Sequence, residues 1–209
     1  AGFADNIIFK PACGSRGGVV IACSGDFAIA PMLAIPDEFS FSATITDRST
    51  NASWSITGVY GPQLAVEKRR FLSELAALKP RMLNEWLVLG DFNLICKAEE
   101  KSNSNINLGL MAQFRNTIDL MELRDMPLSG KKFTWSNERA GRTLTKIDRV
   151  LISNDWELRY PQYQLNPASS VVSDHSPLLL KKMDAKVYKG FRFEAYWLNM
   201  QGIDSVVTQ

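Results

Sequence analysis

The sequence predicts an α+β domain, and three observations carry this prediction. Strand-like runs dominate the first third of the chain, and two segments with helical spacing lie among later strands. The length of 209 residues suits one domain of ordinary size. A composition of 45% hydrophobic and 22% charged residues is typical of a soluble globular chain, and it excludes a disordered tail, a collagen-like repeat and a disulfide scaffold.

Four strand-like runs open the chain, at residues 18–23, 27–35, 39–46 and 53–60. In the third run, apolar residues alternate with serine and threonine; the apolar ones are Phe39, Phe41, Ala43 and Ile45. An alternation of period two is typical of a strand with one buried and one polar face. We therefore expect this strand to be half-buried.

Two amphipathic helices are predicted where apolar residues recur at intervals of three and four. The first ends before Pro80 and carries on its apolar face Phe71, Leu72, Leu75 and Leu78. The basic cluster at 68–70 is interpreted as the polar face of this helix. The second helix is marked by Met111, Phe114, Ile118 and Met121.

The apolar run at 86–89 ends at Gly90 and indicates a central strand covered on both faces. Later strands are predicted at 133–135, 144–152 and 178–180, and residues 184–209 are expected to form a tail beyond the core. No apolar run approaches the roughly 20 residues of a membrane-spanning helix, so no membrane partner is expected.

Three cysteines, Cys13, Cys23 and Cys96, occur without a Cys-x-x-Cys pair. This odd count argues against a structural zinc site and against a disulfide framework. We expect buried free thiols in a reducing, intracellular compartment.

The first candidate site is the sequence Gly-Asp-Phe-Asn at 90–93, directly after the central strand. Asp91 and Asn93 are two residues apart, so their side chains are expected on the same side. A carboxylate beside a carboxamide suits an attacking water and a phosphate oxygen. An Asx-turn that ends the strand is the structural alternative.

The second candidate is Ser-Asp-His-Ser at 173–176, which contains the only histidine of the chain, His175. An imidazole titrates near neutral pH, and a neighbouring acid can fix its tautomer. Asp148 is the third candidate, because it shares one face of a predicted strand with Val150 and Ile152. A buried carboxylate needs a partner, either a nearby Lys or Arg or, in the functional interpretation, His175.

Two aromatic residues and a basic segment complete the candidates. Tyr60 ends a strand and could donate to a phosphate, whereas Trp135 could flank a sugar or base; core packing is the alternative for both. Residues 131–149 hold six basic and two acidic side chains, which suits either a phosphate-contacting surface or a solvated hairpin. The basic residues are Lys131, Lys132, Arg139, Arg142, Lys146 and Arg149.

Taken in order, five motifs of this chain resemble the signatures of the endonuclease/exonuclease/phosphatase superfamily; they are VYGP, GDFN, FTWSN, KIDRVLIS and SDHSP. The match spans roughly residues 15–183. The chain is most similar to the endonuclease domain of plant-type non-LTR retrotransposons, in which an element like 191–194 precedes a reverse transcriptase. Tyr60 favours the apurinic-endonuclease branch over the lipid phosphatases.

The resemblance implies a four-layer α/β sandwich, with two mixed sheets flanked by helices, that hydrolyses phosphoester bonds with Mg²⁺ or Mn²⁺. It also implies DNA as the partner, a nuclear location if the DNA is genomic, and a fused reverse transcriptase in the full-length protein.

The resemblance also implies a role for each candidate residue. Asp91 would align or deprotonate the attacking water, and Asn93 and Tyr60 would hold phosphate oxygens. His175 would bind the phosphate and be oriented by Asp148. The metal would be held by Asp174, and nucleic acid would be contacted by Trp135, Arg139, Arg142 and Lys132.

One part of the family pattern has no counterpart in this sequence. The family's opening strand carries an Asn, and a following strand carries a Glu that binds the metal. We therefore expect residues 1–183 to form an N-terminally incomplete domain that lacks the opening strand-helix-strand unit, and residues 184–209 to form a linker.

Three hypotheses follow for the function. The first is a DNA endonuclease of a retrotransposon-like element, weak or inactive as this fragment. The second is a non-catalytic remnant of that domain. The third is a superfamily phosphatase that acts on small molecules or lipids.

Overall fold

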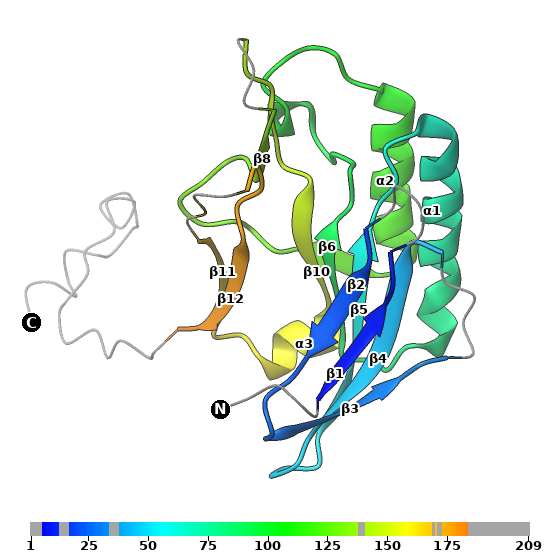
Figure 1. The fold of residues 1–209 in the computed structure, drawn as a ribbon, viewed down its shortest axis with the longest axis vertical. Coiled ribbons are helices and arrows are strands. Elements are labelled where there is room, and N and C mark those ends of the chain that lie inside the picture. The colour runs from blue at the N-terminus through cyan, green and yellow to red at the C-terminus, as the bar shows by residue number, and fades with distance from the viewer. Residues whose placement is uncertain are drawn as a thin grey trace, which may run out of the picture.

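A computed structural model of the chain describes residues 6–12, 17–33, 38–137, 141–168, 170 and 173–183. Its centre is a six-stranded sheet in the order β3-β4-β5-β6-β10-β7 (Figure 1). The strands are β3 (Phe27–Pro31), β4 (Ser40–Asp47), β5 (Ser53–Tyr60), β6 (Trp86–Asp91), β10 (Asp148–Ser153) and β7 (Leu123–Asp125). β5 and β6 run parallel, and every other neighbouring pair in this sheet is antiparallel.

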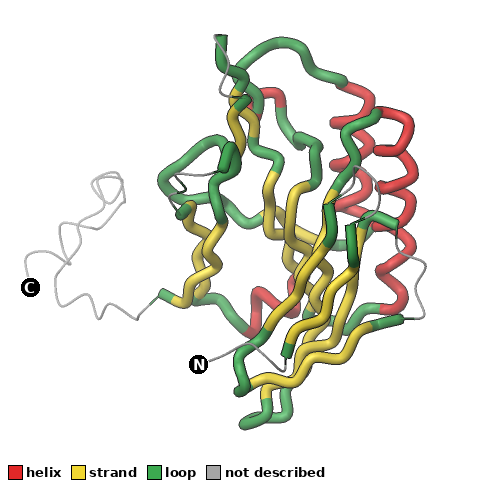
Figure 2. The backbone as a smooth tube through the Cα atoms, in the orientation of Figure 1, coloured by secondary structure: helices red, strands yellow, loops and turns green. Residues whose placement is uncertain are grey.

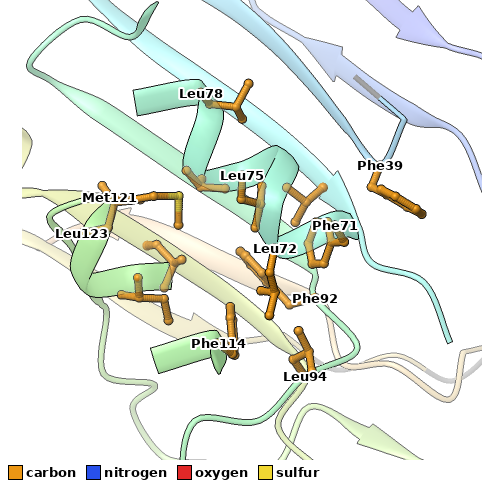
Figure 3. Close-up of a cluster of buried hydrophobic side chains, with 14 of the residues drawn as sticks. Phe39, Phe71, Leu72, Leu75, Leu78, Phe92, Leu94, Phe114, Met121 and Leu123 are labelled. Carbon is orange, nitrogen blue, oxygen red and sulfur yellow. The ribbon is translucent and has the colours of Figure 1, made fainter. Parts of the chain in front are cut away.

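Two helices, α1 (Ala65–Leu78) and α2 (Leu108–Leu120), cover one face of this sheet (Figures 1 and 2). A 3₁₀ turn, η1 (Lys79–Arg81), follows α1 with Pro80 inside it. Figure 3 shows the cluster of buried side chains between these helices and the sheet, including Phe71, Leu75 and Phe114. Burial of each such side chain contributes about 1.5–3 kcal/mol to folding, so this interface stabilises the packing of both helices on the sheet.

The opposite face is covered by two antiparallel hairpins and a short helix (Figure 1). The hairpin of β1 (Ile7–Lys10) and β2 (Val19–Ala22) packs on β4 and β5. The hairpin of β11 (Tyr163–Pro167) and β12 (Leu178–Lys182) packs with α3 (Asn154–Arg159) on β6 and β10. The predicted α+β class is confirmed; within the described residues, the second sheet layer consists of these two separate hairpins.

Several short elements were not predicted from the sequence. They are β1, β7, β11, α3, and the 3₁₀ turn η2 (Ala98–Glu100). Their lengths of three to six residues are too short for a hydrophobic period to emerge. The predicted strand at 144–152 is two strands, β9 (Leu144–Thr145) and β10, and β9 pairs with β8 (Trp135–Ser136) instead of joining the central sheet.

The predicted buried face of β4 is confirmed by Phe41, Ala43 and Ile45, and the first part of its polar face is buried as well. Ser40 and Ser42 are 0% and 1% exposed. The Ser40 hydroxyl donates to Glu74 of α1 at 2.6 Å, and the hydroxyls of Ser42 and Thr57 lie 2.9 Å apart. Since both of these buried hydroxyls have a partner, the start of β4 is buried on its apolar face and on its polar face, whereas Thr44 and Thr46 further along are half-buried.

The other expectations have mixed outcomes. Of the cysteines, Cys96 is buried and Cys23 half-buried, and both are free, whereas Cys13 lies outside the described residues. The predicted tail at 184–209 also lies outside them. Among the described residues, no helix is long and apolar enough to cross a membrane.

Candidate active site

Three strands of the central sheet bring candidate side chains to one edge. Asp91, at the end of β6, is the register partner of Tyr60 on the parallel strand β5 and of Asp148 on the antiparallel strand β10. The preceding residue, Gly90, has φ of +137°, and a Cβ there would lie 2.1 Å from the Val59 carbonyl oxygen. Only glycine fits this close approach, so the Gly-Asp pair follows from the strand geometry.

Asn93 holds the Asp91 carboxylate in place. The Asn93 backbone N–H donates to Asp91 Oδ1 at 2.8 Å, and Asn93 Nδ2 donates to Asp91 Oδ2 at 3.0 Å. The same Nδ2 also donates to the Gly61 carbonyl oxygen at 2.8 Å, and Asn93 has φ of +50°. Both N–H groups of the carboxamide are therefore engaged with the protein, so its present contacts orient Asp91, as in the Asx-turn alternative.

His175 is paired with Asp148, one of the two partners that the sequence left open. Its Nδ1 lies 3.0 and 3.1 Å from the two Asp148 carboxylate oxygens. The hydrogen bond to Asp148 is the largest cause of a raised pKa of His175, against the opposing effect of burial. The histidine therefore gains proton affinity and presents its second ring nitrogen, Nε2, as a donor.

The segment that carries His175 is fixed to the loop around β8. Ser136 N–H donates to the Asp174 carbonyl oxygen at 3.1 Å, and Ser176 N–H donates to the Thr134 carbonyl oxygen at 2.7 Å. Trp135 Nε1 donates to Asp174 Oδ2 at 2.8 Å. Backbone hydrogen bonds on both sides of His175 thus fix its position beside β8, and the indole orients the exposed Asp174 carboxylate.

Asp91 has the most perturbed carboxyl group of the site. The pKa of Asp91 is raised to about 6; burial is the largest cause, and the nearby Asp148 carboxylate acts in the same direction. The hydrogen bond from the Asn93 backbone and the charges of His175 and Lys68 act in the opposite direction. A carboxyl group that titrates near neutral pH within a cleft is typical of a functional site.

These side chains line a cleft of about 920 Å³, close to the upper end of the range for ligand pockets. Its lining includes Tyr60, Asp91, Asn93, Trp135, Asp174 and His175. Asp148 lies behind His175 and lines a neighbouring cavity of about 380 Å³. The strand ends therefore bring together residues that are more than 100 positions apart in the sequence.

Most of the basic candidates lie away from the cleft. Lys132 and Arg142 are exposed and do not line it, and the Lys132 ammonium lies over the Phe133 ring at 5.3 Å from its centroid. Arg139 lies outside the described residues. Two lysines that sequence reasoning did not select, Lys68 and Lys101, do line the cleft.

The interpretation of Lys146 and Arg149 as part of a basic surface was wrong. Arg149 is 0% exposed and donates to Glu100 and Asp125, and Lys146 donates to Asp125 at 2.7 Å. The Arg149 guanidinium also lies over the Phe114 ring, 5.7 Å from its centroid. Both basic side chains are neutralised by ion pairs beneath α2, so they are not available to bind a phosphate.

The site can offer carboxylates to a divalent cation without enclosing it. Among the described residues, no group of three His, Cys, Asp or Glu could hold a metal ion. Mg²⁺, however, is usually bound by one or two carboxylates together with waters and substrate phosphates. Asp91 and Asp174 both line the cleft and are of the required type.

Comparison with known proteins agrees with these motifs. A family model described as the endonuclease/exonuclease/phosphatase family matches residues 6–175. No curated protein has a significantly similar sequence.

Two solved structures share the fold at low sequence identity. The endonuclease domain of TRAS1, a telomere-specific non-LTR retrotransposon, is 13% identical, with a TM-score of 0.66 over 86% of this chain and 81% of that one. D. rerio TDP2, complexed with a single-stranded DNA product, is 12% identical, with a TM-score of 0.53 over 85% and 77%. At these identities the likeness concerns the fold alone.

Proposed function

Because the chain belongs to the endonuclease/exonuclease/phosphatase family, we propose that it hydrolyses phosphodiester bonds of DNA. The observation that carries this proposal is the convergence of Asp91, Asn93, Asp148 and His175 at one sheet edge, beside a cleft of about 920 Å³. Both similar structures are, by their names, proteins that act on or bind DNA, which supports DNA as the substrate.

Asp91 is the proposed base for the attacking water. A carboxyl group with a pKa of about 6 is mostly ionised at neutral pH, yet it is a much better proton acceptor than an ordinary aspartate. The two hydrogen bonds from Asn93 fix the direction of its lone pairs. Asn93 therefore acts as a positioning residue in this proposal; a phosphate could be held by its Nδ2 only after one of the present contacts is released.

His175 is the proposed donor to the phosphate oxygens. Protonation makes it a cation, and Asp148 holds its Nδ1–H so that Nε2–H is the group left for substrate. A charge-assisted hydrogen bond strengthens as negative charge grows on the phosphoryl oxygens in the transition state. Tyr60 lines the same cleft and would contribute a neutral hydroxyl donor.

A divalent cation, Mg²⁺ or Mn²⁺, would be held by Asp174 together with waters and substrate oxygens. When bound, it supplies Lewis-acid stabilisation of charge on the phosphoryl group. The Trp135 indole would keep Asp174 turned toward the cleft.

A plasmid-nicking assay with Mg²⁺ or Mn²⁺ tests the proposal. We expect the unmodified chain to convert supercoiled DNA to the nicked form and His175→Ala to lose about 10²–10³-fold in rate, the range seen when one donor to a transition-state oxyanion is removed. Asp119→Asn, an exposed carboxylate on α2, serves as the matched control and should nick normally.

Equal nicking by the unmodified chain and His175→Ala would remove His175 from the mechanism. Cleavage of an inositol phosphate without cleavage of DNA would replace the nuclease by a small-molecule phosphatase. Folded protein without any hydrolysis would indicate a non-catalytic remnant of the family.

A further inference from the structure

Two lysines from segments remote from His175 in the sequence, Lys68 and Lys101, line the cleft. Lys68 comes from the first turn of α1, and Lys101 directly follows η2. Both line the same cleft as Asp91, together with the polar side chains of Gln63, Asn105 and Asn107. Neither lysine takes part in the proposed hydrolysis.

Each ammonium is anchored on a neutral backbone oxygen. Lys68 Nζ donates to the Asn93 carbonyl oxygen at 2.7 Å, and Lys101 Nζ donates to the Asn105 carbonyl oxygen at 2.5 Å. An ammonium has three N–H donors, so each lysine retains donors after this contact. A carbonyl anchor fixes the position of the charge but does not neutralise it.

Neither ammonium is held in an ion pair within the part of the chain that the structure describes. There, neither lysine has a carboxylate within 4.0 Å, whereas Lys79, Lys146 and Arg149 all form such ion pairs. Burial lowers the pKa of Lys68, the Asp91 carboxylate raises it, and the ammonium of Lys101 lowers it again. Two like charges that face one cleft without ion pairs are stabilised when an anion binds between them.

We propose that Lys68 and Lys101 form a second phosphate-binding subsite, which receives a phosphate group adjacent to the one that is hydrolysed. This inference rests on the proposed function and narrows its substrate to a nucleic-acid strand that carries a phosphate beside the scissile one. The cleft volume of about 920 Å³ leaves room for more than a single phosphate group.

Asn93 connects the two subsites. Its side chain fixes Asp91, and its carbonyl oxygen receives Lys68, so one residue sets the position of the ammonium relative to the base. A strand whose flanking phosphate contacts Lys68 is thereby aligned with Asp91. Small phosphodiesters that lack a flanking phosphate cannot use this alignment.

Binding measurements at several salt concentrations test the subsite. The full chain carrying His175→Ala binds a fluorescent 12-nucleotide DNA duplex without turnover, and Lys68→Gln and Lys101→Gln are added singly and together. Each lost phosphate contact should reduce the slope of log K against log salt by about 0.9 and weaken binding about eightfold at 0.1 M salt. The double variant should lose about sixtyfold by the same relation.

Arg69→Gln is the matched control, because Arg69 is the exposed neighbour of Lys68 on α1 and does not line the cleft. It should leave the slope unchanged. A second test compares two substrates in the chain that carries Lys101→Gln as its only change. The variant should slow the hydrolysis of a DNA oligonucleotide about eightfold more than the hydrolysis of bis(p-nitrophenyl) phosphate, a small diester without a flanking phosphate.

The subsite is overturned if both lysine variants keep the slope of Arg69→Gln, or if the oligonucleotide and the small diester lose activity to the same extent. The proposed function fails separately, if the unmodified chain hydrolyses neither substrate while the lysine variants still change the salt slope. The two failures therefore produce different results.

Discussion

Replacement of Asp148 by Asn should lower the pKa of His175. The two residues form the tightest charge pair of the site, with Nδ1 to oxygen distances of 3.0 and 3.1 Å. Asparagine has nearly the same shape and retains an oxygen that can accept the Nδ1–H hydrogen bond. The substitution therefore removes the negative charge and leaves most of the packing intact.

The size of the effect follows from the exposure of the pair. Two unit charges about 4 Å apart attract by about 1 kcal/mol in water and about 4 kcal/mol at an effective dielectric constant near 20. The side chains of His175 and Asp148 are 33% and 16% exposed, so the pair is partly screened by water. Its attraction should therefore lie between these two energies. Loss of about 2 kcal/mol corresponds to a fall of roughly thirtyfold in the proton affinity of the imidazole, which lowers the pKa of His175.

NMR titration of the imidazole ring measures this pKa directly, because His175 is the only histidine in the chain. Asp174→Asn is the control; the Asp174 charge also raises the pKa of His175 but is the smallest of the causes, so the fall should be smaller. A His175 pKa that is the same in the Asp148→Asn variant and the unmodified chain would refute the pairing on which the site rests.

The same pair makes stability depend on pH in one direction. Since the folded-state pKa of His175 is raised, its contribution is fully present below the unfolded-state pKa of about 6.5 and is lost as the pH rises through the folded-state value. Urea unfolding should therefore show a larger difference between the unmodified chain and Asp148→Asn at pH 6 than at pH 9.

Three further predictions concern the base, the strand turn and the buried ion pairs. The rate of DNA hydrolysis should rise with pH through about 6, the pKa of Asp91, and Asp91→Asn should remove this limb; a flat profile in the unmodified chain would contradict its role as base. In thermal unfolding, Gly90→Ala should destabilise the fold by at least about 2 kcal/mol, because the new Cβ would lie 2.1 Å from the Val59 carbonyl oxygen. Gly130 also has a positive φ, but a Cβ there would meet no atom within 4 Å, so Gly130→Ala should cost only about 1 kcal/mol. Arg149→Met should cost about 3–5 kcal/mol in urea unfolding, because it leaves the largely buried Glu100 without a counter-charge and Asp125 with Lys146 alone. Lys79→Met, which breaks an exposed pair, should cost less than about 1 kcal/mol, and similar losses in both variants would count against the cluster.

The sequence was most informative where chemistry and strand geometry coincide. Asp91, Asp148 and His175 each follow or begin an apolar strand, and the parallel and antiparallel pairing of β5, β6 and β10 then brings them to one edge. Strand ends are readable from a single sequence because a glycine or a polar cluster interrupts an apolar run.

Buried polar residues could not be assigned from the sequence in the same way. Arg149 was assigned to the basic segment at 131–149, because its partners Glu100 and Asp125 come from a 3₁₀ turn and a three-residue strand that carry no periodic signal. The alternation of β4 did not indicate that Ser42 is buried, because its hydrogen bond with Thr57 is visible only once β4 and β5 are paired.

Lys68 illustrates the same limit at the site itself. Its neighbours Arg69 and Arg70 are exposed on α1, and the three basic residues look equivalent in sequence. Lys68 differs because its ammonium donates to the Asn93 carbonyl oxygen, just beyond the end of β6. The roles of Lys132, Arg139 and Arg142 in nucleic-acid binding stay predictions.

A crystal structure of the Asp91→Asn variant with a short DNA duplex and Mg²⁺ would test the central claim most directly. The account predicts one phosphate within hydrogen-bonding distance of His175 Nε2, near the Asp91 position, and the neighbouring phosphate against Lys68 and Lys101. DNA that lies along the basic segment at 131–142, with no phosphate in contact with His175, would contradict it.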